Sequence, residues 1–265
     1  MISADEVVAL AISVFLAVVT WCKWSWVAIS VKRYNQSRTA GVSLLGGVAL
    51  GAVLLLFVLG RWSSSDVRDS TIYTSFYFAM GLGFTGMVLA GFDRLGLSVR
   101  DDVFERFNPA AAITLAGTTV GTMVAFAGAN IGDGPGWWVV VFCAAMSNGA
   151  LLLGWAMLDL FTNVGERITV DRDVSTAWRA AGWFAATGII YGRAVAGTWL
   201  GIDAAMSDFV MFGIGGLVLL VIALVAELGM KRGTLPRSAV TGGVLPGIVY
   251  VALAIAYVSQ LPPWK

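Results

Sequence analysis

The chain has no histidine, only two cysteines and few charged residues, which make up 12% of its 265 residues. Without histidine there is no imidazole for acid–base or nucleophilic catalysis and no two-histidine metal motif. No serine or threonine stands in a recognisable nucleophile motif either. We therefore expect a protein that is not an enzyme and that needs neither a metal nor a cofactor.

The residues that are abundant are apolar, at 58% of the sequence. Such a composition cannot be solvated as a water-soluble domain of this length, and a stretch of about 20 apolar residues spans the hydrocarbon core of a bilayer. Apolar windows run over residues 7–31, 41–60, 72–92, 110–129, 137–161, 176–198, 208–227 and 239–259. The sequence thus predicts an all-α, polytopic membrane protein with eight transmembrane helices in a single domain, residues 1–265.

The positive charges are distributed unevenly over the predicted loops. Eleven of the 17 Lys and Arg residues fall in or beside the first, third, fifth and seventh loops: Lys32, Arg33, Arg38, Arg94, Arg100, Arg106, Arg167, Arg172, Lys231, Arg232 and Arg237. Cytoplasmic loops carry the excess of cations, so these loops are predicted to be cytoplasmic and both termini non-cytoplasmic. In this topology Cys22 and Cys143 lie in different leaflets, which excludes a disulfide between them.

Small residues recur at one register through the chain. With Arg38, Asn108, Asp173 and Thr234 aligned as a common origin, small residues stand nine and thirteen positions later: Gly47, Gly51, Gly117, Gly121, Gly182, Ala186, Gly243 and Gly247. This pattern predicts four tandem two-helix repeats of the same orientation, at about residues 7–62, 72–132, 137–200 and 206–260. Small residues four apart favour close helix packing, and we interpret them as packing sites.

Two of these repeats carry a recognisable motif. The segment 105–113, Glu-Arg-Phe-Asn-Pro-Ala-Ala-Ala-Ile, is followed by Leu-Ala-Gly-Thr-Thr-Val-Gly at 115–121, and residues 172–177 followed by Ala181 and Gly182 form a more diverged copy. This stretch resembles the YjfL-like bacterial inner-membrane family, domain of unknown function 350. The resemblance extends from about Tyr73 to Trp199, the size of a whole four-helix member, so the chain looks like two short members fused. It implies a bacterial inner-membrane location and no established activity.

Charges inside the predicted spans are the candidate functional residues, because an unpaired charge in hydrocarbon is costly. Lys23, Asp93 and Asp159 stand at similar positions of three repeats. They form either a buried cluster on a proton or ion path, or helix ends at the cytoplasmic headgroups with Lys23 snorkelling. Arg179 is predicted to reach Asp173 or lipid phosphates, and Glu227 to end its helix.

Arg193 differs from these, since it lies about 22 Å along its helix from the cytoplasmic interface. The connector to the next helix is short, so Asp208, ahead of Asp203, is predicted to pair with it. The pair is interpreted either as an outer gate or anion site, or as a structural link between two helices.

Two hypotheses for function follow from these features. In the first, the in-span charges line a route for a small ion or solute. The hydroxyls of Thr114, Thr118, Thr119 and Thr122 are interpreted either as part of that route or, preferably, as groups that hydrogen-bond to backbone or to neighbouring helices. In the second, the protein is a non-catalytic scaffold whose charged loops dock a cytoplasmic protein partner. The expected partners are the lipid bilayer and, by either hypothesis, further copies of the chain, but not nucleic acid.

Overall fold

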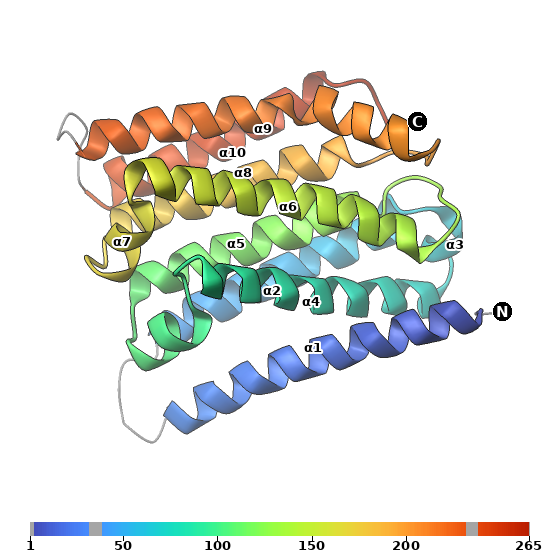
Figure 1. Cartoon of the computed structure of the whole chain (residues 1–265), viewed down its shortest axis with the longest axis horizontal. Coiled ribbons are helices and arrows are strands. Elements are labelled where there is room, and N and C mark those ends of the chain that lie inside the picture. Colours follow the sequence, from blue (N-terminus) through green and yellow to red (C-terminus); the bar gives the residue numbers. More distant parts are fainter. Residues whose placement is uncertain (1–2, 32–38, 232–237, 265) are drawn as a thin grey trace.

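The computed structural model describes residues 3–31, 39–231 and 238–264 as an antiparallel bundle of long helices (Figure 1). The long helices are α1 (Ala4–Val31), α2 (Thr39–Arg61), α4 (Thr71–Arg94), α5 (Pro109–Gly128), α6 (Trp137–Thr162), α8 (Val174–Ala194), α9 (Ile202–Lys231) and α10 (Leu245–Gln260). Short elements join them: α3 (Ser65–Arg68), α7 (Val164–Thr169) and two π-helices, η2 (Val99–Glu105) and η3 (Val240–Val244). Each predicted apolar window corresponds to one long helix.

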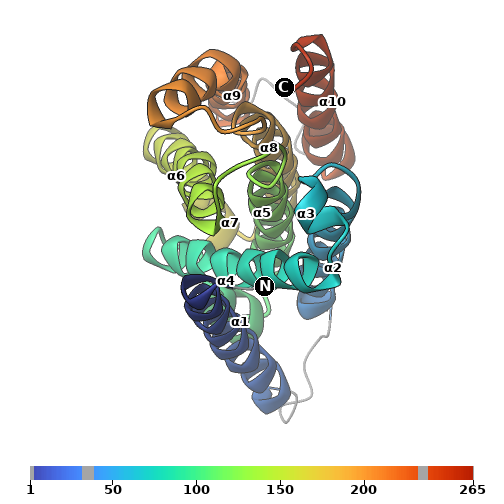
Figure 2. The ribbon, with the colours of Figure 1, turned by 90° about the vertical axis from the view of Figure 1, so that its right-hand side faces the viewer.

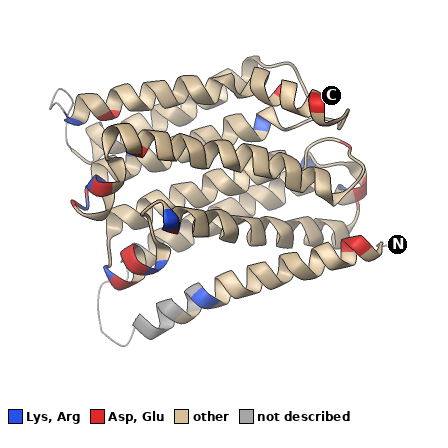
Figure 3. Ribbon diagram, viewed as in Figure 1, with Lys and Arg blue, Asp and Glu red and all other residues tan. Residues whose placement is uncertain are grey.

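Both chain ends lie at one end of the bundle, together with α3 (Figure 1). We call this the terminus end and the other, which carries η2 and α7, the opposite end. Charged residues gather largely at these two ends and leave the middle of the bundle apolar (Figure 3). This distribution is the one that a bilayer requires of a protein that crosses it.

Seven helices of the described chain are long and apolar enough to cross a membrane: α1, α2, α4, α5, α6, α9 and the η3–α10 segment. The eighth predicted span, residues 176–198, corresponds to α8, which is not among the seven because it is less apolar. Sixteen of its 21 residues are buried. A helix enclosed by other helices contacts little lipid, so it can hold arginine, serine and threonine that a lipid-facing helix could not.

The helices form two layers (Figure 2). The second helices of the predicted hairpins, α2, α5, α8 and α10, pack in a row in that order. Helices α4, α6 and α9 cover one side of the row, and α1 packs against α4. Helices α5 and α8 make the most extensive contact and lie in the middle of the bundle. Residues from both pack with α6 in the core, where Leu115, Phe184 and Trp155 have no exposed surface.

Small residues allow this row to pack closely. A Cβ atom on Gly47 would lie 2.6 Å from Cα of Ala116, and one on Gly117 or Gly182 would overlap the facing backbone at Ala181 or Gly247. Gly121 faces the carbonyl of Phe184 in the same way. The other predicted packing residues occupy the same row: Gly51 against Met123, Gly243 against Ser175, Gly247 against Trp178, and Ala186, fully buried.

The segments that precede α5 and α8 have matching backbones. Phe107 and Arg172 have left-handed φ angles of 53° and 54°, and each is followed by the residue that caps the next helix. The caps are Asn108 and Asp173, whose own N–H groups donate to carbonyls six residues earlier, both at 2.9 Å. These are two of the four residues chosen as the repeat origin, whereas Arg38 and Thr234 lie outside the described residues.

Candidate functional site

The structure does not bring Lys23, Asp93 and Asp159 together in a buried cluster. Lys23 and Asp93 are exposed, and Asp93 stands next to the last residue of α4. Asp159 is half-buried, and its Oδ1 accepts the N–H of Gly165 at 2.7 Å, where α6 turns into α7. Of the two interpretations, the described residues fit the second, because both carboxylates lie near the ends of their helices.

Arg193 has partners other than the predicted ones. It is 7% exposed, its guanidinium donates to the carbonyl of Pro262, and its Cζ lies 5.3 Å and 5.7 Å from the ring centroids of Phe212 and Trp264. None of the ion pairs among the described residues joins it to Asp208 or Asp203. Asp208 is near enough to interact electrostatically with Arg193, but the direct contacts come from the segment after α10, which supplies a carbonyl and an aromatic face.

Three of the four threonines considered as pore-lining groups form hydrogen bonds within their own helix. Thr114, Thr118 and Thr119 donate to carbonyls four residues earlier in α5, at 3.0, 2.9 and 2.7 Å. The hydroxyl of Thr122 is buried without a partner in the described chain. This arrangement gives no support to a row of hydroxyls facing a permeant ion.

A buried ion network lies near the opposite end, between α8 and α9. Arg179 and Glu227 are 1% and 2% exposed and form a two-point pair, Nε to Oε1 at 2.6 Å and Nη2 to Oε2 at 2.9 Å. Arg167 of α7 contacts the same carboxylate, Nη2 to Oε2 at 2.5 Å. Two guanidinium groups thus share one buried carboxylate, and only Arg167 of the three side chains is partly exposed.

The remaining donors of Arg179 bind polar groups from other elements. Nη1 donates to Ser175 Oγ at 2.9 Å and to the carbonyl of Gly242 in η3, and Nη2 donates to Thr176 Oγ1 at 2.9 Å. Thr176 in turn donates to Asp173 at 2.5 Å, which brings a second carboxylate to the network. We call Arg167, Asp173, Arg179 and Glu227 the ion network; it ties α7, α8, α9 and η3 together.

Sequence analysis missed the pair of Arg179 and Glu227 because Arg179 was assigned to Asp173 or lipid phosphates and Glu227 to the end of its helix. Arg179 and Glu227 are 48 residues apart in the chain, and their pairing depends on how α8 packs against α9. The sequence did contain one signal. Arg179 and Glu227 carry opposite charges, and both lie a few residues from the opposite end of the bundle, in α8 and α9. Opposite charges in hydrocarbon are expected to form an ion pair.

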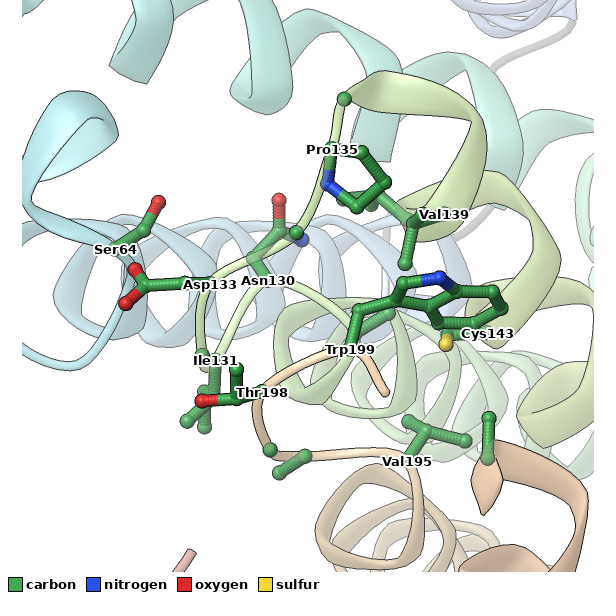
Figure 4. Close-up of a pocket in the computed structure, with 18 of the residues that line it drawn as sticks. Ser64, Asn130, Ile131, Asp133, Pro135, Val139, Cys143, Val195, Thr198 and Trp199 are labelled. Atoms are coloured by element: carbon green, nitrogen blue, oxygen red, sulfur yellow. The ribbon is translucent and has the colours of Figure 1, made fainter. Parts of the chain in front are cut away.

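The second candidate region is a pocket of about 220 Å³ at the terminus end (Figure 4). Its walls come from the start of α1, from α3 and α4, and from the first turns of α6 and α9 with the loops before them. The two loops are joined by backbone bonds from Gly197 to Ile131 at 2.9 Å and from Trp199 to Asp133 at 2.8 Å. The predicted site residue Asp208 lines this pocket rather than pairing with Arg193.

The pocket has an acidic rim and an unsatisfied acceptor at its base. Glu6, Asp66, Asp133 and Asp208 line it, and no Lys or Arg of the described residues does. Asn130 is 4% exposed; its Nδ2 donates to Phe126 at 2.9 Å, whereas its Oδ1 has no partner in the described chain. In Figure 4 the amide of Asn130 lies between Asp133 and Pro135.

These features define a class, the integral membrane proteins that cross the bilayer as a bundle of α-helices. Residues 66–194 match the model of the family described as Domain of Unknown Function (DUF350), so this part of the chain is similar to that family. The resemblance from about Tyr73 to Trp199 is confirmed over that range. The match covers α3 to α8, including Arg167, Arg179 and Asn130, but not Glu227. Comparison with curated proteins and with solved structures gives no match.

Proposed function

We propose that the protein is a carrier that moves a small solute across the bacterial inner membrane without catalysing a reaction. The observation that supports this function is the difference between the two ends of the bundle. A water-accessible pocket enters the terminus end, whereas the ion network joins four segments at the opposite end. This is the arrangement of a carrier open to one side and closed to the other.

The energetics of the ion network support a role beyond stability. Burying charges has a desolvation cost that their attraction often fails to recover, and apolar residues of similar volume are frequently as stable. Glu227 is at the far end of α9 from the pocket, and its partners Arg167 and Arg179 lie on α7 and α8. If these bonds break together, α9 separates from α8 and the opposite end opens.

For the membrane topology we propose α8 as an eighth span, so that four hairpins of the same orientation form the bundle as two fused short members. By the positive-inside rule the opposite end is cytoplasmic and both termini are outside. Cysteines introduced at Ser64 and Ala204, in a Cys22→Ser, Cys143→Ser background, are expected to react with a membrane-impermeant thiol reagent applied to intact cells. A cysteine at Ser98 is expected to react only after permeabilisation, and the reverse pattern contradicts the orientation.

Transport is tested by flux into proteoliposomes, measured for Na⁺, K⁺, protons and choline. We expect flux of at least one of these above protein-free liposomes. Modification of a Ser64→Cys variant with a bulky maleimide is expected to lower that flux at least fivefold, because Ser64 lines the pocket. Ser65→Cys is the matched control, since Ser65 is exposed next to Ser64 but does not line the pocket.

The scaffold hypothesis gives a different result in the same assay. A scaffold has no path for solutes between its helices. The flux of every solute is therefore equal to that of protein-free liposomes, and modification of Ser64→Cys has no effect on permeability. That outcome would reject the carrier.

A further inference from the structure

We infer that the pocket at the terminus end binds a small organic ammonium ion. This inference names the solute class of the carrier proposed above and in that respect rests on it. Three independent properties of the pocket lead to it: the sign of its charge, the unpaired acceptor at its base and the aromatic rings in its wall.

The charged residues that line the pocket are all acidic, and the cation that interacts with one of them, Arg193 with Asp208, lies outside the lining. None of its four carboxylates belongs to an ion pair among the described residues, and three of them, Asp66, Asp133 and Asp208, are exposed at the rim. A cleft lined by one sign of charge concentrates counter-ions and raises their association rate. The rim therefore attracts cations and repels anions.

The acceptor at the base points to a ligand that donates hydrogen bonds or carries positive charge. The bond from Asn130 Nδ2 to the carbonyl of Phe126 fixes the orientation of the amide, which leaves Oδ1 as the free group. A buried acceptor without a partner costs about 1–3 kcal/mol. A hydrogen-bond donor or a positive charge brought to Oδ1 offsets this cost, whereas an apolar molecule does not.

Aromatic rings in the wall favour an organic cation over a bare metal ion. Tyr73, Tyr77 and Trp199 line the pocket, and Trp199 is held by edge contacts with Trp138 and Phe142, at centroid distances of 5.3 and 5.8 Å. Ring faces attract ammonium groups, and aromatic cages recognise quaternary ones. No group of three His, Cys, Asp or Glu residues in the described chain is placed to chelate a metal, and about 220 Å³ admits several non-hydrogen atoms.

The test is calorimetric titration of the purified chain in detergent with choline and with its neutral carbon isostere, in which a tert-butyl group replaces trimethylammonium. We expect choline to bind and the isostere to give no heat above dilution. Asp66→Asn combined with Asp133→Asn is expected to weaken choline binding about tenfold. Asp69→Asn combined with Asp203→Asn, which removes two exposed carboxylates outside the pocket lining, is expected to change it less than twofold.

Thermal unfolding of each variant verifies that it is folded. Equal binding of the two probes, no choline binding to the folded wild type, or displacement of choline by equimolar K⁺ would overturn the inference. Binding is measured without a membrane gradient, so it is independent of transport. Choline binding without flux retains the ammonium site and rejects the carrier, whereas flux of another solute without choline binding retains the carrier and rejects the ammonium site.

Discussion

Replacement of Glu227 by alanine is expected to lower the free energy of unfolding by about 3–5 kcal/mol, the usual cost of removing one partner from a buried ion pair. The loss arises because Arg179, which is 1% exposed, keeps its charge and loses both carboxylate bonds. Arg167 loses its carboxylate partner at the same time. The measurement is reversible unfolding in mixed micelles, with increasing amounts of a denaturing detergent.

Two variants control this experiment. Glu166→Ala removes an exposed carboxylate from α7 at the same end of the bundle and is expected to change stability by less than about 0.5 kcal/mol. Arg179→Met combined with Glu227→Leu removes the central pair together and is expected to recover much of the loss. Equal losses for Glu166→Ala and Glu227→Ala would show that water reaches the ion network, and would remove the basis for treating it as a closed end.

Gly121→Ala is expected to destabilise the bundle by about 1–3 kcal/mol or more, the range for an added carbon in a close-packed interior. Its Cβ would lie 2.8 Å from the carbonyl carbon of Phe184 and still closer to the oxygen, so α5 and α8 must move apart. Backbone atoms cannot turn aside as a flexible side chain can. The same unfolding assay measures the loss.

Gly149→Ala provides the matched control, because no atom lies within 4 Å of a Cβ built on this glycine of α6. Alanine has a helix propensity about 1 kcal/mol better than glycine, so this variant is expected to be as stable as the wild type or more stable. Equal losses for Gly121→Ala and Gly149→Ala would contradict the close contact of α5 with α8.

Much of the fold could be predicted from the sequence because lipid imposes a simple requirement. Every long apolar window corresponds to a helix, since a backbone in hydrocarbon must satisfy its hydrogen bonds within the segment. The register of small residues identified positions such as Gly47, Gly117 and Gly182, at which neighbouring helices meet. Asn108 and Asp173, chosen as the repeat origin, cap α5 and α8. These properties depend on local sequence.

The partners of the charged residues were decided by tertiary structure alone. Arg179 and Glu227 each resembled a residue at the membrane surface, and Arg193 was assigned to Asp208, because sequence gives depth along a helix but not the direction in which a side chain points. Packing of α8 between α5, α6, α9 and α10 turns Arg179 toward Glu227 and places Arg193 beside Pro262. The pocket likewise depends on two loops more than sixty residues apart in the chain, at Ile131 and Gly197, which meet through backbone bonds. Hydropathy carries no information about such contacts, because they are set by which helices pack together and by their rotation about their own axes.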